Sequence, residues 1–68
     1  MRIDRIKLRL ELAKRDMTQK KLSELSGVSR VTVNAIVNGK RCSSDVADKI
    51  ALALNVDIKE ILAGDEHA

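Results

Sequence analysis

The sequence predicts an all-α fold, a compact domain of five short helices. Apolar residues recur at three- and four-residue spacing in five successive segments, which is the period of a helix with one buried face. The chain has no proline and no aromatic residue, so its core must be built from Leu, Ile, Val, Ala and Met, as suits a small helical bundle. Its three glycines, at positions 27, 39 and 64, each stand where a helical pattern stops.

The 68 residues are expected to form one domain, residues 1–68, with no internal linker. Residues that commonly cap helices precede the apolar segments: Thr18, Ser29, Ser43 or Ser44, and Asp57. We therefore expect helices over about residues 2–14, 18–26, 29–37, 44–54 and 57–62. Residues 63–68 are expected to be a frayed tail.

Most of the expected helices have one apolar face. The core positions on the second to fifth helices are Leu22, Leu25, Val33, Ile36, Val37, Val46, Ala47, Ile50, Ala51, Leu54, Ile58, Ile61 and Leu62, and Val28 fills a corner. The first helix differs, because two opposite sides are apolar. One side carries Ile3, Ile6, Leu10, Ala13 and Met17, and the other carries Leu8 and Leu12. Such a helix is either buried on both sides or contacts a second partner, for example another copy of the chain.

Residues 18–38 are the most informative segment, because they predict two short helices joined by a tight turn. Gly27 suits the turn, since glycine adopts a positive φ without steric cost. The outward face of the second helix of this pair carries Arg30, Val31, Asn34 and Asn38. Arginine and asparagine can pair with base edges in the major groove of DNA, and valine can pack on a thymine methyl group. The segment therefore indicates a helix that reads base edges.

Charge is distributed unevenly along the chain. The net charge is +3, but residues 1–41 carry 11 Lys and Arg against 4 Asp and Glu, or +7, and residues 42–68 carry 2 against 6, or −4. A basic half indicates a face for an anionic polymer, with the acidic half turned away from it. An ordinary solvated charged surface is the alternative interpretation.

Other functional classes find little support. No run of 18 or more apolar residues is present, so we expect no membrane span, and no signal peptide is recognisable. One cysteine and one histidine, Cys42 and His67, are too few for a tetrahedral zinc site. No catalytic constellation indicates an enzyme, and neither a cofactor nor a small-molecule ligand is expected. A single cysteine fits a reducing cytoplasm. Basic neighbours can lower the pKa of a thiol, but we expect Cys42 to pack rather than to sense redox state.

The segments MTQKKLSEL, GVSRVTV, VNGKR and IALALNVDIKEIL together resemble the phage repressor and Cro-type helix-turn-helix domains, the Xre family of bacterial transcriptional regulators. The resemblance extends from about Ile6 to Leu62. It implies the same five-helix, repressor-like order, with the second and third helices as the DNA-binding unit. The lactose-repressor family has a segment like GVSRVTVNAIVNG, but there the motif opens the chain, whereas here a helix precedes it.

The resemblance also implies roles for individual residues. Carried over by position, the residues that contact bases are Ser29, Arg30, Val31 and Asn34. Those that contact phosphates are Gln19, Asn38, Lys40 and Arg41. Gly39 lets the loop after the third helix turn, so that its amides can face the DNA backbone.

Three departures from the family pattern stand out. Ser23 replaces a frequent alanine, and Cys42 replaces a frequent proline. Leu12 and Val37 stand where many members carry an arginine and a glutamate that form a buried ion pair. Replacing both members of such a pair by apolar residues can be neutral or stabilising. We therefore expect Leu12 and Val37 to touch in the core.

These observations predict a sequence-specific regulator, a repressor that binds a near-palindromic double-stranded DNA operator as a homodimer. The dimer is expected to form through the last helix and its flanks, Val56, Ile58, Ile61 and Leu62. The side of the first helix with Ile3, Ile6 and Leu10 is the alternative. Prophage control, restriction–modification control and antitoxin autoregulation all remain open. The competing hypothesis is a protein-interaction module that keeps the fold without binding DNA.

Overall fold

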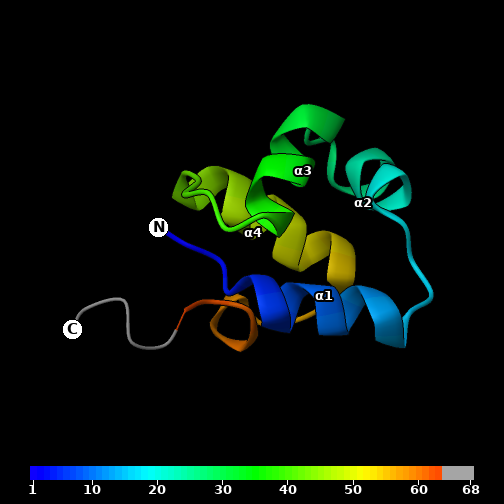
Figure 1. Cartoon of the computed structure of the whole chain (residues 1–68), viewed down its shortest axis with the longest axis horizontal. Helices are drawn as coiled ribbons and strands as arrows, with labels where there is room; N and C mark the ends of the chain where they lie inside the picture. The colour runs from blue at the N-terminus through cyan, green and yellow to red at the C-terminus, as the bar shows by residue number, and fades with distance from the viewer. Residues whose placement is uncertain (64–68) are drawn as a thin grey trace.

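The computed structural model describes residues 1–63, which fold into four α-helices and one 3₁₀ turn (Figure 1). The elements are α1 (Arg5–Lys14), α2 (Gln19–Ser26), α3 (Arg30–Val37), α4 (Ser44–Leu54) and η1 (Ile58–Glu60). Within residues 1–63 there is no strand, only an isolated antiparallel bridge between Ile3 and Leu62. The all-α prediction is confirmed, and α2, α3 and α4 lie within one residue of the expected boundaries.

The helices begin where side chains can cap them. Thr18, Ser29 and Ser43 each accept a hydrogen bond from the backbone N–H three residues on, at 3.0, 3.2 and 3.2 Å, as predicted. The start of α1 was predicted too early. Asp4 is its N-cap, and one carboxylate oxygen accepts the N–H groups of Ile6 and Lys7 at 2.8 and 3.0 Å.

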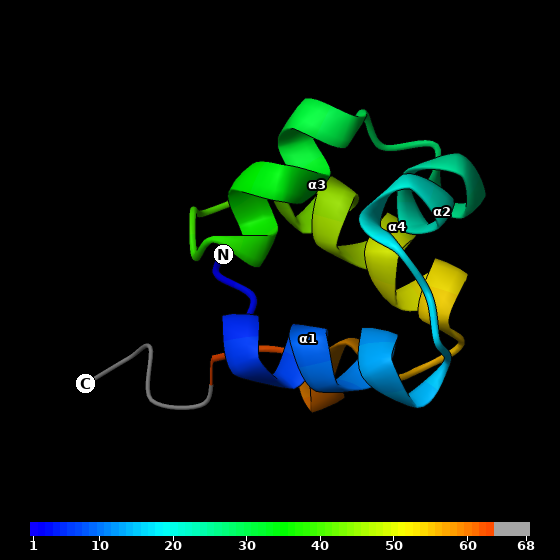
Figure 2. The same cartoon turned by 45° about the vertical axis from the view of Figure 1, so that its right-hand side comes forward.

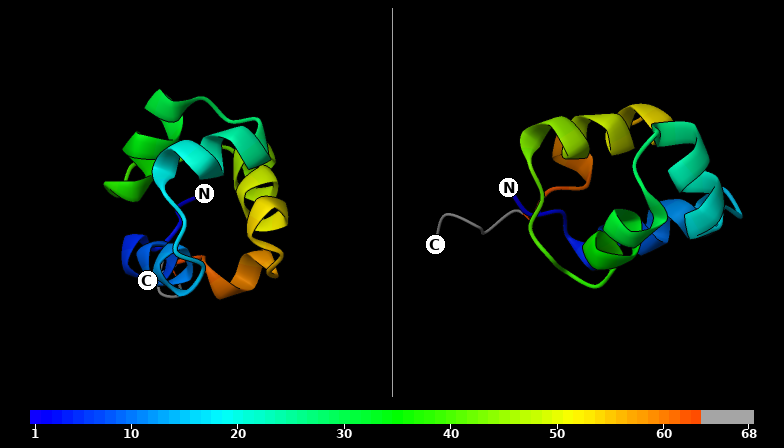
Figure 3. Two further views of the ribbon diagram at one scale, coloured as in Figure 1. Left: turned by 90° about the vertical axis from the view of Figure 1, so that its right-hand side faces the viewer. Right: turned by 90° about the horizontal axis from the view of Figure 1, so that it is seen from above.

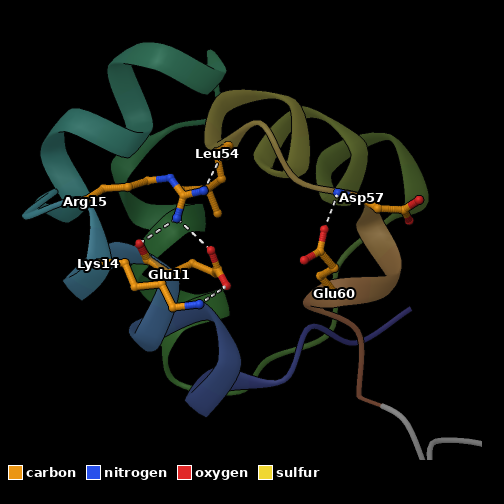
Figure 4. Close-up of polar contacts among 6 residues, drawn as sticks. All are labelled: Glu11, Lys14, Arg15, Leu54, Asp57 and Glu60. Atoms are coloured by element: carbon orange, nitrogen blue, oxygen red, sulfur yellow. Dashed lines mark hydrogen bonds and ion pairs between the residues drawn. The ribbon is translucent and has the colours of Figure 1, made fainter.

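The prediction of a fifth helix over residues 57–62 is wrong, because only a single 3₁₀ turn forms there. Asp57 caps the turn, and its own N–H donates to Glu60 Oε2 at 3.1 Å (Figure 4). The next carbonyl, that of Ile61, accepts the N–H of Asp4 at 2.8 Å instead of continuing a helix. The N-terminal segment therefore pairs with the backbone that a longer helix would use. The expectations for Gly64 and for a frayed tail beyond Ala63 lie outside the described residues.

One core fills the space between the helices, which surround it when the domain is viewed end-on (Figure 3, left). Helix α2 packs against both α3 and α4, α1 packs against α3, and η1 packs against α4 (Figure 2). The largest fully buried side chains are Ile3, Leu8, Leu22, Val33, Ile36, Ile50, Leu54 and Ile61. The apolar faces predicted for α3 and α4 are confirmed, with Val46 half-buried at the edge.

Helix α1 buries only one of its two apolar sides. Leu8 and Leu12 lie in the core, with 0% and 8% of their surface exposed. Ile6 and Leu10 face outward and are 70% and 54% exposed. On α2, Leu25 was expected in the core but is 52% exposed, because Leu22 alone occupies the inward position there.

Charged side chains of α1 bond to the rest of the domain. The guanidinium of Arg15 donates to Glu11 Oε1 at 2.6 Å and to the carbonyl of Leu54, at the end of α4, at 2.7 Å (Figure 4). Lys14 pairs with the same Glu11 carboxylate at 3.4 Å. Glu11 is buried, yet these hydrogen bonds hold its pKa below the usual value, with Arg15 the main cause. The result is a charged link between α1 and α4.

Candidate nucleic-acid interface

The turn between α2 and α3 is held by specific contacts. Gly27 ends α2 in the left-handed region, with φ of 76°. The Ser23 hydroxyl donates to the Val28 carbonyl at 2.6 Å, and the Val28 N–H donates to Ser26 Oγ at 3.2 Å. Val28 itself is 6% exposed, so it fills the corner as predicted. These bonds fix the direction of α3 relative to α2, and the part played by the Ser23 hydroxyl was not predicted.

The outward face of α3 is exposed, and of its four predicted residues only Asn38 has a partner within residues 1–63, since its Oδ1 accepts from Arg9 Nη2 at 3.5 Å. Arg30, Val31 and Asn34 are all exposed, and Val31 is 82% exposed. Among residues 1–63, the side chains of Arg30 and Asn34 make no hydrogen bond or ion pair. The opposite face holds Val33, Ile36 and Val37 in the core. Helix α3 therefore presents one cationic, one apolar and one amide side chain to solvent on a well-anchored support.

Ser29 differs from the other residues expected to contact bases. Its hydroxyl oxygen accepts the N–H of Thr32 at 3.2 Å, and its hydroxyl donates to Thr32 Oγ1 at 2.9 Å. Its single proton and one of its lone pairs are therefore already used within α3. Ser29 is therefore the N-cap of α3, as the sequence predicted. The sequence also predicted that Ser29 contacts DNA.

The expected phosphate-contacting residues lie on either side of α3. Gln19 opens α2 and is half-buried. On the other side, Asn38 caps the end of α3, and Lys40 and Arg41 follow it in an exposed loop. Gly39 has a φ of 95°, which supports the predicted turn. The Lys40 N–H donates to the Ala35 carbonyl at 3.0 Å, so the loop is tied to the helix.

Two arginines of α1 also reach this loop and were missed in the sequence. Arg9 Nη2 lies 3.4 Å from the Val37 carbonyl and 3.5 Å from Asn38 Oδ1. Arg5 lies across Gly39, with its Cδ 3.7 Å from the position that a Cβ on that glycine would take. Nothing in the helix-turn-helix motif points to α1. The available signal was the four-residue spacing of two arginines on one side of a helix.

Cys42 is half-buried, and burial raises the pKa of its thiol above the usual value, against a smaller lowering effect of the N-terminal ammonium. The basic neighbours thus do not activate it, contrary to the effect considered from the sequence. Its N–H donates to the Met1 carbonyl at 2.9 Å, which holds the loop against the start of the chain. His67 lies outside the described residues.

The expected dimer surface needs one correction. Ile61 is fully buried in the monomer core, so it has no surface to offer a second copy. Val56, Ile58 and Leu62 are half-buried and keep some exposed apolar area. On the alternative side, Ile3 is also buried, whereas Ile6 and Leu10 are exposed.

In residues 1–63, no three metal-ligating side chains come together. No helix in this part of the chain has both the length and the apolar character needed to cross a membrane.

Comparison with known proteins agrees with this geometry. A family model described as the Cro/C1-type HTH DNA-binding domain matches residues 7–64. No curated protein matches the chain. Two solved structures of PhpD, one with cadmium atoms and one with cadmium and hydroethylphosphonate, are similar in fold, with a TM-score of 0.79 and 25% sequence identity. Each match covers 93% of this chain but only 14% of PhpD. The family model matches most of the length of the chain. The chain therefore belongs to the Cro/C1-type helix-turn-helix DNA-binding domains.

Proposed function

We propose that the protein binds double-stranded DNA in a sequence-specific way, with α3 in the major groove. The observation that carries this proposal is the outward face of α3, whose Arg30, Val31 and Asn34 have no intramolecular partner among the described residues. Arg30 can donate two hydrogen bonds to guanine O6 and N7, and Val31 can pack on a thymine methyl group. Asn34 can pair with adenine or hold a phosphate. Ser29 contributes at the edge of this face through the second lone pair of its hydroxyl oxygen, which its bonds to Thr32 leave free.

The flanking groups supply contacts that do not depend on sequence. The start of α2 presents Gln19 beside unpaired backbone N–H groups and the positive end of the helix dipole, an arrangement suited to a phosphate. On the far side of α3, Asn38, Lys40 and Arg41 line the loop. Contacts on both sides of the groove would fix the orientation of α3 before any base is read.

We further propose a homodimer on a near-palindromic operator, acting as a repressor, as the resemblance to phage repressor and Cro domains favours. A two-fold axis would place two recognition helices about 34 Å apart, one turn of DNA. Val56, Ile58 and Leu62 form the favoured contact, since Asp57, Lys59 and Glu60 beside them bring both signs of charge. The outer face of α1 is the alternative, but Arg9, Lys7 and Lys14 would bring like charges together there.

Selection of bound sequences from a random DNA pool tests the proposal. We expect enrichment of two inverted half-sites with centres about 10 base pairs apart. A single enriched half-site would contradict the dimer while keeping DNA binding. No enrichment at all would contradict the proposed function. Leu62→Lys should then reduce cooperative binding more than Leu10→Lys, with helicity measured to confirm folding. The reverse order would assign the interface to α1.

The competing hypothesis is a protein-interaction module. It gains some support from the PhpD match, because the same fold there forms 14% of a longer chain. Substitution of Arg30 separates the two hypotheses, since it should impair binding of DNA by a regulator. Prophage control, restriction–modification control and antitoxin autoregulation would share one DNA-binding mode. The genes that lie beside the selected operator would distinguish these three alternatives.

A further inference from the structure

We propose that Arg5 and Arg9 of α1 form a second phosphate-binding position, which extends the DNA-backbone contact of the loop after α3 onto α1. The ligand is a phosphodiester group of the DNA strand that passes the loop. This inference rests on the proposed function, but it assigns the contact to a helix outside the helix-turn-helix unit.

Arg9 is already directed at the loop. Its Nη2 is shared between the Val37 carbonyl and Asn38 Oδ1, at 3.4 and 3.5 Å. Both contacts are long, and both use the same nitrogen. A guanidinium has five N–H donors, so those on Nε and Nη1 remain available to an anion. The contact thus orients Arg9 beside Asn38 without using up its capacity to bind.

Arg5 stands one turn earlier on the same side of α1. Its side chain crosses Gly39, and together with Asn38 it lines an open cleft of about 360 Å³ between the start of α1 and the loop. Asp4 also lines this cleft. Its Oδ1 is occupied by two backbone N–H groups, and these bonds hold the pKa of the Asp4 carboxyl below its usual value. Its negative charge faces the α1 N-terminus and leaves the Arg5 guanidinium without an ion pair among residues 1–63.

The other cations of α1 provide the contrast that singles out this pair. Lys7 donates to the Leu62 carbonyl at 3.2 Å, while Lys14 and Arg15 both pair with Glu11. In the described part of the chain, Arg5 and Arg9 have no acidic partner. Like charges four residues apart on a helix repel each other.

Lys40 adds a third unpaired cation on the adjoining loop. A group of cations that repel one another gains most from a shared anion, and the planar guanidinium fork matches phosphate oxygens. The ligand is therefore expected to be a phosphodiester rather than a base edge, because Arg5 and Arg9 come from α1 and not from the outward face of α3.

The test measures how DNA affinity depends on salt for Arg5→Ala, Arg9→Ala and Arg9→Gln. Removing one phosphate contact should lower the slope of log K against log salt by about 0.9 for each bound protomer, equally on the selected operator and on unrelated DNA. Lys40→Ala is the positive control. Lys49→Ala is the matched negative control, because it removes the same charge from α4, where Lys49 pairs with Asp45 at 3.3 Å. Arg9→Lys should restore most of the slope.

The outcomes separate this inference from the proposed function. If Lys40→Ala lowers the slope while the Arg5 and Arg9 variants match Lys49→Ala, the α1 site is wrong and the proposed function stands. If the wild-type protein binds no DNA, both fail. A slope lost only on the operator would assign these arginines to base contact and would also overturn the inference. Circular dichroism confirms folding, and Arg9→Gln serves if Arg9→Ala unfolds.

Discussion

Several polar side chains on and just after α1 bond to distant parts of the domain, whereas two on the outward face of α3 have no intramolecular partner within residues 1–63. Lys7 reaches Leu62 and Arg15 reaches Leu54, both backbone carbonyls far along the chain. On α3, Arg30 and Asn34 have no partner among residues 1–63. Both helices bury one apolar side, so packing alone does not distinguish them.

The difference shows how a domain of this size divides its charged residues between stability and binding. A small core leaves little surplus stability, so links such as Arg15 to the end of α4 help hold the frame. The groups that we propose to pair with DNA are left unpaired, within residues 1–63, on a helix whose ends are capped locally. Arg9 lies between these cases, because it contacts the end of α3 and still has free donors.

The largest expected effect comes from placing a charge on the buried side of α1. Leu12→Arg buries an unpaired cation in the apolar core and should lower the free energy of unfolding by about 3–5 kcal/mol. Leu10→Arg is the matched control on the exposed side of the same helix, and it should change stability little. Urea denaturation measures both.

The same position tests whether the two core residues touch. Adding Val37→Glu to Leu12→Arg should recover part of the loss, because the two charges can pair. A double-mutant cycle without coupling would show that the two side chains are not neighbours. That result would mean that Leu12 and Val37 do not form an apolar contact in place of the buried ion pair found in many family members.

On α3, Arg30→Ala should cost about 1–3 kcal/mol of binding free energy on the preferred operator and relax the preference at one base pair. Stability should be unchanged, since Arg30 has no intramolecular partner. Lys40→Ala provides the comparison, because loss of a phosphate contact weakens all sequences about equally. Binding to a panel of single-base operator variants distinguishes the two patterns. A uniform loss for Arg30→Ala would reassign Arg30 to phosphate contact.

Removing a helix N-cap should have a smaller effect on the free energy of unfolding. Ser29→Ala removes the N-cap of α3 and the hydrogen-bond partner of Thr32, and should lower the free energy of unfolding by about 1 kcal/mol. Ser44→Ala, one residue beyond the Ser43 cap of α4, should have little effect on thermal unfolding. Equal effects of the two substitutions would mean that the Ser29 hydroxyl is not what secures α3.

The difference between α1 and α3 also explains what could be predicted from the sequence. The pattern of α3 has one apolar face, so its buried side and its exposed Arg30 followed directly. The pattern of α1 has two, and only packing against α3 decides that Leu8 rather than Ile6 faces inward. The shortened last helix depends on pairing between Asp4 and Ile61, residues far apart in the chain. Contacts of this range leave no local signal. For Arg5 and Arg9 the sequence shows only their four-residue spacing, which does not identify the loop that they reach.

The smallest expected effect is a change in acid sensitivity that belongs to α1 alone. The hydrogen bond from Arg15 holds the pKa of Glu11 below its unfolded value, so the ionised carboxylate favours the folded state. This contribution is fully present above the ordinary carboxyl range and is lost as the pH falls through the folded pKa. The stability gap between wild type and Glu11→Gln should therefore narrow on acidification, as measured by urea denaturation at several pH values. A gap that stayed constant for Glu11→Gln would mean that Glu11 bonds equally well when protonated, and that the link from α1 to α4 depends on the Arg15 contact with the Leu54 carbonyl.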